Sequence, residues 1–464
     1  MKSPRTAKCR TGVFLLTVCV LVGTAAALAW LGPASKKGAV LAKYNYWQFW
    51  LAILFTLAAL SVFLVATVRP DRRRGVAFRL LAAWIGVALG MTLTEFAAYL
   101  LPIRNQMDNP WYFSAGGGVS ESAELPFARP PHLKWSGWSR GDLATVDGEE
   151  DPDARWITFE TDWQGFRNSK DLKQADLIAI GDSFTEAGNL PEEESFCALV
   201  GRQLGVSARN LGRAGYGAWS ELLVLKHYGL ACRPKLVVWQ IAESNDLENA
   251  MRFAKWVAAG RPPFFDFDAD RKWQRQKAWM QRSPTFQIFG WLRRHEPASP
   301  WPGGIFQGQR GVGRLVRFLG LAPLDGSVRE NLWLPFHWEA LNQGVKLCRS
   351  NNIQLVFIMI PNKYRVLGPH TRMLDASIAA PVSVPATGRS NTLGGLSQTW
   401  CDSRGVPFVD ATDALEARAA KGELVYQAFD THLSTAGHEV VAELLLETFQ
   451  NLNPPTNKSV SPQE

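Results

Sequence analysis

The sequence predicts an α/β protein: a parallel β-sheet with helices on both faces, preceded by three membrane-spanning helices. In the C-terminal two thirds, short apolar runs alternate with helical stretches, which is typical of a parallel sheet covered on both sides. Near the N-terminus, three apolar runs are each about 20 residues or longer, the length that crosses a bilayer. The chain has 464 residues, of which 47% are hydrophobic and 20% charged. It is therefore long enough for several structural units, and its composition is not that of a disordered protein.

The expected membrane anchor, residues 1–102, contains the runs Thr11–Leu31, Tyr44–Val68 and Leu80–Leu101. The first run has a cleaved signal peptide as its alternative interpretation. Its apolar stretch exceeds the usual ~7–15-residue core of such a peptide, and two more runs follow it. We therefore expect a retained helix and three membrane crossings.

The distribution of charge predicts the orientation of this anchor. Residues 1–102 carry 12 Lys and Arg against Asp71 and Glu95, leaving 38 basic and 40 acidic residues in the rest of the chain. Basic residues flanking membrane spans favour the cytoplasmic side. They occur in the N-terminal tail (Lys2, Arg5, Lys8, Arg10) and between the second and third runs (Arg69, Arg72, Arg73, Arg74, Arg79), although Lys36, Lys37 and Lys43 lie in the intervening loop. We expect a multi-pass protein of the cell (inner) membrane, with a cytoplasmic N-terminus and a periplasmic or extracellular C-terminal domain, and no nucleic-acid partner.

Composition suggests the organisation of the remainder. Residues 103–155 are rich in Gly, Pro, Ser and Trp, which predicts an irregular linker. The α/β domain is expected over 156–452, with an aromatic and basic insertion at about 251–329 and a disordered tail at 453–464. The insertion is either a lid that binds substrate or a helical subdomain with its own small core, and the second interpretation is preferred for most of its aromatic residues.

Apolar patterning places the elements of the domain. The expected strands are Leu177–Ile180, Leu236–Gln240, Gln354–Ile360 and Pro407–Val409, and the expected helices include Ser195–Leu204, Ser220–Tyr228, Leu334–Asn351 and Ala436–Phe449. Four cysteines fall in this region, Cys197, Cys232, Cys348 and Cys401. Their wide spacing resembles no metal site, and three disulfide pairings, or none, remain open.

Four short segments carry residues suited to catalysis. Gly181-Asp182-Ser183 follows an apolar strand, at the carboxyl edge where parallel sheets bind ligands and where a helix N-terminus favours negative charge. Alone, these three residues are explained as well by a helix cap. Three further segments contain Asn210–Gly217, then Asn245 after the next strand, and finally Asp430 two residues before His432.

With these four segments in this order, the chain resembles the SGNH (GDSL-like) hydrolase superfamily over roughly residues 156–449. The resemblance implies that Ser183 attacks an acyl carbonyl, that His432 removes its proton and that Asp430 orients the imidazole. It also implies an oxyanion hole formed by the N–H groups of Ser183 and Gly215 and the side-chain amide of Asn245. It implies no cofactor and no metal.

Two positions depart from the family pattern. Only Thr431 separates Asp430 from His432, whereas two residues are usual; alginate-type O-acetyltransferase relatives share the shorter spacing. Ser244 stands before Asn245 where glycine is usual. A second histidine, His438, is expected to be structural, because only His432 has a neighbouring carboxylate.

The predicted function is a serine esterase that acts through an acyl-enzyme. The expected substrate is an acyl ester, most simply an O-acetyl ester, of a cell-envelope glycan or lipid. One alternative is an O-acyltransferase that moves the acyl group to a glycan hydroxyl and works with a multi-span acyl-donor partner. Another is a catalytically silent binding or assembly module on the same fold.

Overall fold

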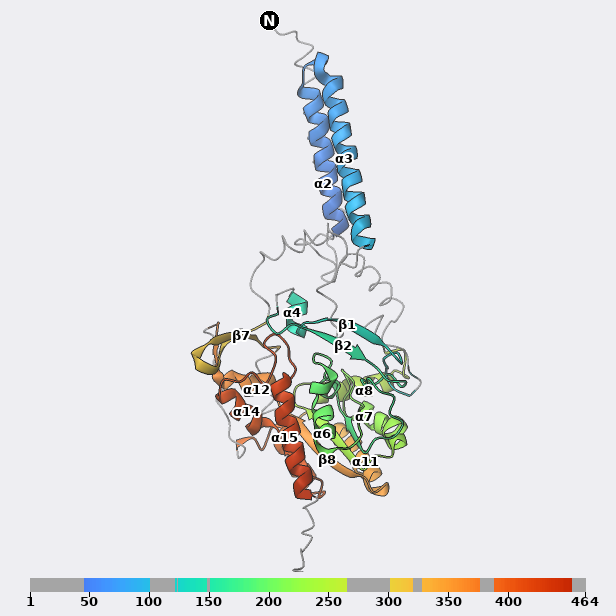
Figure 1. Ribbon diagram of the computed structural model, residues 1–464, viewed down its shortest axis with the longest axis vertical. Helices are drawn as coiled ribbons and strands as arrows, with labels where there is room; N and C mark the ends of the chain where they lie inside the picture. The colour runs from blue at the N-terminus through green and yellow to red at the C-terminus, as the bar shows by residue number, and fades with distance from the viewer. Residues whose placement is uncertain are drawn as a thin grey trace, which may run out of the picture. The chain divides into compact units, whose positions relative to one another are not determined.

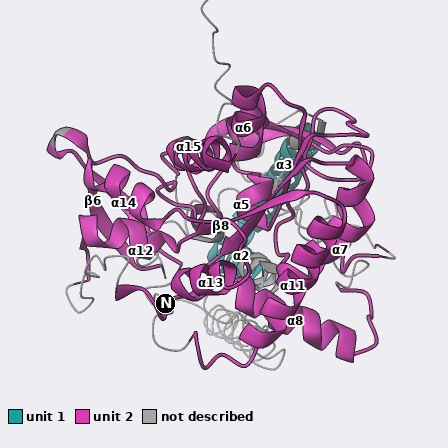
Figure 2. Cartoon of the chain, turned by 90° about the horizontal axis from the view of Figure 1, so that it is seen from below, with its two compact units in different colours: residues 1–102 teal, residues 103–464 magenta. Residues whose placement is uncertain are grey.

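The computed structural model describes residues 46–100, 122, 124–147, 151–264, 301–319, 328–375 and 388–452. The chain divides into two compact units, residues 1–102 and residues 103–464 (Figure 2). The first expected membrane span, at residues 11–31, and the tail at 453–464 lie outside the described residues.

The described part of the first unit, residues 46–100, contains the helices α2 (Tyr46–Thr67) and α3 (Arg73–Leu100), joined through the short 3₁₀ helix η1 (Pro70–Arg72). The indole of Trp84 in α3 donates a 3.1 Å hydrogen bond to Ser61 Oγ in α2. Arg73 donates to the carbonyl oxygens of Ala66 and Val68, which satisfies backbone acceptors at the C-terminus of α2.

Within the described residues, one helix is long and apolar enough to cross a membrane. It covers Pro70–Ala97, with a mean hydropathy of 1.8 and an apolar stretch that is not buried inside the structure. Within α2, the segment Thr56–Thr67 is also apolar but is shorter than a membrane span. Three spans were expected, and the described residues provide one helix that meets the length and composition of a span.

The second unit combines a central parallel sheet with surrounding helices (Figure 1). Its strands are β1 (Lys134–Ser139), β2 (Arg155–Glu160), β3 (Leu177–Ile180), β4 (Ala208–Asn210), β5 (Leu236–Ala242), β6 (Gly303–Gln307), β7 (Gly313–Arg317), β8 (Gln354–Ile360), β9 (Thr371–Met373) and β10 (Phe408–Asp410). Its described α-helices are α4 (Asp142–Asp147), α5 (Ser183–Glu186), α6 (Phe196–Leu204), α7 (Ala218–Val224), α8 (Asp246–Ala258), α11 (Leu334–Ser350), α12 (Lys363–Leu367), α13 (Leu393–Asp402), α14 (Thr412–Ala420) and α15 (Thr435–Leu452). The four expected strands and four expected helices are present, with bounds that differ by a few residues.

The central sheet has the order β10-β8-β5-β3-β4, and every pair in it is parallel. The chain starts at β3, moves outward to β4, and then returns across β3 to begin β5 on its other side. This reversal creates a switch point between β3 and β5, and ligands of open α/β sheets bind beyond the carboxyl ends of strands at such a point. The residues that follow β3 and β5 are therefore placed next to each other at one edge.

The strands are buried on both faces, as their continuous apolar sequences predict. In β5, Val238 and Ala242 pack into the cluster that contains α6 and α15, whereas Val237, Trp239 and Ile241 pack into the cluster that contains α7, α11 and α13. Alternate residues of a strand point to opposite faces, so one run of apolar residues supplies both cores. The result is a three-layer α/β/α domain.

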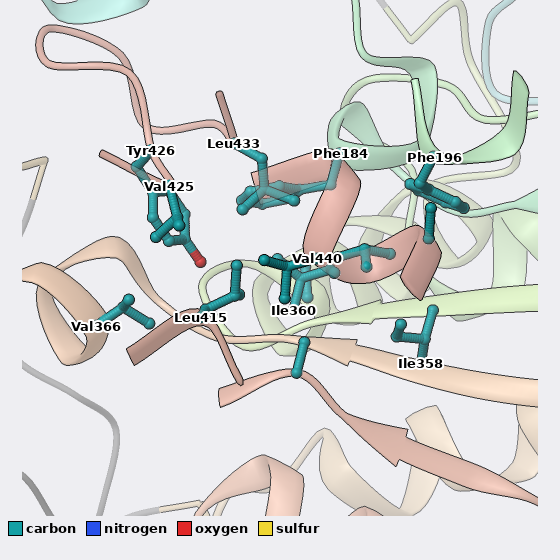
Figure 3. Packing of buried hydrophobic residues seen from close by; sticks show 14 of the residues in the cluster. Phe184, Phe196, Ile358, Ile360, Val366, Leu415, Val425, Tyr426, Leu433 and Val440 are labelled. Carbon is teal, nitrogen blue, oxygen red and sulfur yellow. The ribbon is translucent and has the colours of Figure 1, made fainter. Parts of the chain in front are cut away.

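The core on the α6 and α15 side extends directly under the candidate site. Figure 3 shows Phe184, which follows Ser183, in the same cluster as Phe196 of α6, Val440 of α15 and Ile360 of β8. Phe184, Phe196 and Val440 are each at most 4% exposed. Burying a large apolar side chain contributes roughly 1.5–3 kcal/mol, so this cluster holds the turn after β3 against the last helix.

Two smaller sheets lie outside the central one. Strands β1 and β2 form an antiparallel pair in which Trp138 is opposite Trp156, and β6 pairs with β7 and β9. The segment 103–155 was expected to be an irregular linker, yet it contains β1 and α4. The expected insertion at 251–329 contributes the end of α8 and the strands β6 and β7, so its described part is not purely helical; residues 265–300 within it are not described.

Candidate active site

The turn after β3 presents Ser183 at the carboxyl edge of the sheet. Asp182 is the N-cap of α5, and its carboxylate accepts a 2.9 Å hydrogen bond from the N–H of Phe184. At Gly181 a side chain would collide with its surroundings, because an added Cβ would lie 2.3 Å from Thr185 Oγ1 and 2.4 Å from Gln240 Oε1. Glycine is therefore required here by the close approach of β5.

Ser183, His432 and Asp430 form one continuous hydrogen-bonded chain. Ser183 Oγ lies 2.8 Å from His432 Nε2, and His432 Nδ1 lies 2.5 Å from Asp430 Oδ1. The same carboxylate oxygen also accepts a 2.8 Å bond from the backbone N–H of His432. The structure thus joins residues 249 positions apart in the sequence. The three side chains that the sequence predicted to act together are in contact.

His432 and Asp430 shift each other's pKa in the direction that favours the charged forms. Burial alone lowers the pKa of His432, but the charge and hydrogen bond of Asp430 outweigh it and raise that pKa to about 9. Burial likewise opposes ionisation of Asp430, but the positive charge of His432 and its hydrogen bonds hold the pKa of Asp430 below the ordinary value. A charged imidazolium is therefore well stabilised at this position, which is the form a general base reaches after accepting a proton.

The expected oxyanion donors lie on the two loops beside Ser183. Gly215 has φ +82°, which favours glycine, and is exposed. Among the described residues, the backbone N–H groups of Ser183 and Gly215 donate to no protein acceptor. The Asn245 amide donates a 2.9 Å hydrogen bond to Asp182 Oδ2. Since an amide carries two hydrogens, one remains for a ligand.

A buried network of charged residues holds these loops together, and the sequence did not predict it. Glu186, at the end of α5, accepts hydrogen bonds from Arg129 at 2.7 and 3.0 Å and from Arg213 at 3.1 Å. The Ala214 N–H donates to the same carboxylate at 3.2 Å. These arginines hold the pKa of Glu186 at about 2 although burial opposes its ionisation. Glu186 thereby ties the helix of the nucleophile to the loop that carries Gly215.

Two further charged residues contact the loop that carries Asp430, and both were missed. Lys363, in α12, is 5% exposed, and its ammonium donates to the carbonyl oxygens of Arg317, Gln427, Ala428 and Asp430 at 2.7–2.8 Å. Asp142, at the start of α4, contacts Asp430 and Thr431 from the other side. No local sequence signal marks either residue, because their partners are distant in the sequence.

The residues Asp142, Asp430 and His432 also satisfy the spacing of a metal site, with ligand atoms within 4.8 Å of one another. Hydrogen bonds account for this proximity. His432 Nδ1 faces Asp430, and the Asp142 oxygens accept from Thr431. The donor set therefore fits an acid–base assembly.

The second histidine, His438, lies in a structural environment. Its Nδ1 accepts a 3.2 Å hydrogen bond from the N–H of Phe196, and burial lowers its pKa to about 3.

A cavity of about 710 Å³ lies apart from these residues. It runs along β2, α6 and β4 and is lined by residues that include Trp156, Glu192 and Arg202. Ser183, Asp430 and His432 do not line it.

The buried cysteines have no part in the site. Cys197, Cys232, Cys348 and Cys401 are all free thiols. The structure therefore contains none of the three disulfide pairings that the sequence left open. Burial raises the pKa of Cys197, Cys348 and Cys401 to about 12, which makes these thiols unreactive.

The sheet and the hydrogen-bonded chain define a class: an α/β protein with a Ser–His–Asp arrangement at a topological switch point. No protein-family description and no curated protein match this chain. Solved structures do match.

A protein described as lipolytic and of the G-D-S-L family, from Desulfitobacterium hafniense, is 14% identical, with 58% of this chain and 97% of that chain covered and a TM-score of 0.31. A GDSL-like lipase from Bacteroides thetaiotaomicron is 11% identical, with coverage of 61% and 91% and a TM-score of 0.29. A catalytic mutant of an acetylxylan esterase from Geobacillus stearothermophilus is 14% identical, with coverage of 59% and 93% and a TM-score of 0.31. At these identities and TM-scores, the likeness assigns neither a substrate nor a catalytic residue to this chain.

Proposed function

We propose that this chain is a serine hydrolase that cleaves acyl esters through a covalent acyl-enzyme. The single observation that carries the proposal is the unbroken chain from Ser183 Oγ through His432 to Asp430, with contacts of 2.8 and 2.5 Å. A serine hydroxyl is a weak nucleophile unless a neighbouring base removes its proton, and a base acts best when a third group orients it. Here Ser183 supplies the hydroxyl, His432 the base and Asp430 the group that orients the base.

In the first half of the proposed reaction, Ser183 Oγ attacks the acyl carbon while its proton passes to His432 Nε2. The carbonyl π electrons move to the oxygen, and the N–H groups of Ser183 and Gly215 and the free amide hydrogen of Asn245 stabilise the oxyanion. When the intermediate collapses, the ester C–O bond breaks and the leaving alkoxide takes the proton from His432. Each oxyanion donor of this kind typically lowers the barrier by about 3–4 kcal/mol.

In the second half, water attacks the acyl carbon and gives a proton to His432 Nε2. Collapse of this intermediate releases the carboxylic acid and returns the proton to Ser183 Oγ. If a sugar hydroxyl replaces the water, the same acyl-enzyme yields transfer, so the O-acyltransferase alternative differs only in the acceptor. The chemistry needs no group beyond the residues named.

The hydrolase is proposed to act at the outer side of a membrane, on an O-acyl ester of a glycan or lipid. Helix α3 supports this proposal, because it is long, apolar and unburied, with Arg72, Arg74 and Arg79 near its start. Its test is extraction of cell membranes with alkaline carbonate. The full chain should stay in the membrane pellet and the chain without residues 1–102 should not. Release of the full chain would contradict the anchor.

The enzymatic proposal is tested with p-nitrophenyl esters of several acyl lengths. The wild-type chain should hydrolyse at least one of them, and Ser183→Ala should reduce kcat on the order of 10⁶-fold. Ser397→Ala is the matched control, since Ser397 is a buried serine on α13, outside the site, and should leave kcat unchanged. An inactive wild type with every acyl length would favour a silent binding module, and full activity in Ser183→Ala would exclude this serine as nucleophile.

Adding glycan acceptors to the same assay distinguishes the esterase from the O-acyltransferase. If the acyl group is released only to water, the transferase alternative is excluded.

A further inference from the structure

A second carboxylate lies directly beside the acid–base pair. Asp142 Oδ1 accepts from the backbone N–H of Thr431 at 3.0 Å, and Asp142 Oδ2 accepts from Thr431 Oγ1 at 2.6 Å. The backbone N–H of Asp142 donates to Asp430 Oδ2 at 3.1 Å. Asp142 therefore binds both residues that precede His432.

The neighbours of Asp142 in the chain hold it against the loop that carries Asp430. The next two N–H groups of α4, those of Leu143 and Ala144, donate to the Phe429 carbonyl at 3.2 and 3.3 Å. An added Cβ on Gly141 would lie 2.0 Å from the same carbonyl oxygen, so only glycine permits this approach. The Asp151 carboxylate accepts a 2.6 Å hydrogen bond from the Gly141 N–H. Residues 141–144 therefore all lie against the catalytic loop, which is the loop that carries Asp430 and His432.

The short spacing between Asp430 and His432 explains why such support matters. With one residue between them, the backbone N–H and the ring Nδ1 of His432 both contact Asp430 Oδ1. The other oxygen of Asp430 is left to an outside donor, and the backbone of Asp142 provides it. The intervening Thr431 has both of its polar hydrogens facing Asp142. The geometry of the pair is therefore determined by α4 as much as by its own loop.

We propose that Asp142 is a positioning residue of the acid–base pair, which holds Asp430 and Thr431 in place and adds a second negative charge that stabilises the His432 imidazolium. The proposal rests on the proposed serine chemistry and extends the catalytic unit to a segment N-terminal of the central sheet. Asp142 does not touch the reacting atoms, so its effect acts through Asp430 and His432.

The charged groups around Asp142 determine the sign of its effect. They are Asp430 and His432 on the catalytic loop, Asp151 and Asp153 after α4, Lys363 of α12, and Asp182, which also faces His432. Burial and Asp430 raise the pKa of Asp142 to about 6, so it is charged where His432 titrates. Removing this charge makes the imidazolium less stable, so the pKa of His432 falls and its neutral form appears at lower pH.

The test compares Asp142→Asn and Asp142→Ala in the full chain, by kcat/KM against pH with an ester that the wild type hydrolyses. Asparagine removes the charge but keeps a hydrogen-bond partner for Thr431, so the acid limb of its profile should move down by roughly 1 pH unit. Alanine also removes the side-chain contacts with Thr431, while the backbone N–H at position 142 can still donate to Asp430, and its kcat should fall on the order of tenfold or more with little change in KM. Glu160→Gln removes a carboxylate from β2, in the same segment but paired with Lys134, and should change neither quantity.

A merely structural role would give a different result. Both variants would then lower the melting temperature while the active fraction kept the wild-type pH profile and kcat, and this outcome would overturn the inference. A variant that fails to fold is replaced by Thr431→Val, which keeps the charge of Asp142 and removes the contacts of the Thr431 hydroxyl with Asp142 Oδ2 and with His432 Nδ1. This variant should lower kcat without moving the acid limb. Failure of the serine chemistry is distinguishable, because Ser183→Ala would then retain the activity of the wild type.

Discussion

At the scale of single residues, the proposed reaction depends most directly on the protonation state of His432. Its imidazole must be neutral to take a proton from Ser183, but the negative charges around it favour the protonated form and raise its pKa to about 9. The same charges stabilise the imidazolium that forms during the reaction. The site therefore gains transition-state stabilisation and loses active fraction at neutral pH.

This balance predicts an alkaline pH dependence. The kcat/KM for a neutral ester should rise with pH as His432 loses its proton and level off above about pH 9, where the base is neutral. The raised pKa also predicts the direction of a stability effect. The contribution of the pair to stability is complete below the unfolded value of about 6.5 and is lost as pH rises through about 9. A profile that levels off below pH 7 in the wild type would contradict both statements.

The residues that could be predicted from the sequence are those with a local signature. Ser183 follows a strand and a glycine, and Asp430 and His432 lie two positions apart. The sequence alone therefore predicts that these three side chains act together. Asp142 and Lys363 have no such signature, because each acquires its role from a loop more than 60 residues away. The oxyanion role predicted for Asn245 stays a prediction, and its amide lies beside Asp182, to which it donates one of its two hydrogens.

At the scale of elements, α5 is held in place by buried charge. Its last residue, Glu186, is fully buried and contacts Arg129 and Arg213, and the Arg167 guanidinium donates to the carbonyl oxygens of Glu186, Ala187 and Leu190. Helix α5 has only four residues, too short to be stable alone. The position of Ser183 therefore depends on this network.

Replacing Glu186 should be among the most destabilising changes outside the triad. Glu186→Ala removes the carboxylate that Arg129 and Arg213 both contact while their charges stay buried, and breaking a buried pair in this way costs about 3–5 kcal/mol. Urea unfolding of the second unit should report a loss of this size. Glu248→Gln is the control, because it breaks an exposed pair with Arg252 and should change the free energy of unfolding by less than about 1 kcal/mol. Equal stability of the two variants would show that the arginines find other partners.

The elements that the sequence predicted are those with strong periodicity. Strand β8 was expected and found at Gln354–Ile360, and α11 begins at Leu334 as expected. Strand β1 and helix α4 were missed for a physical reason. The strand KWSGWS is short and half polar, and the six-residue helix DLATVD has no apolar repeat, so both are stabilised by tertiary contacts that composition does not reveal.

At the scale of the whole molecule, the central claim is that the fold brings the Ser183 hydroxyl and the His432 imidazole, which are 249 positions apart in the sequence, to one edge of one sheet. Between them the chain forms the strands β4, β5, β8 and β10 of the central sheet, and the switch point between β3 and β5 places Ser183 at that edge. The topology of the central sheet thus forms the site, and residues 1–102 are a separate compact unit.

Labelling with a fluorophosphonate, followed by mass-spectrometric mapping of the modified peptide, tests this claim most directly. The adduct should lie on Ser183, and its rate of formation should fall sharply in His432→Ala and rise with pH in the wild type. Labelling of a different serine, or labelling of Ser183 at the same rate without His432, would contradict the account.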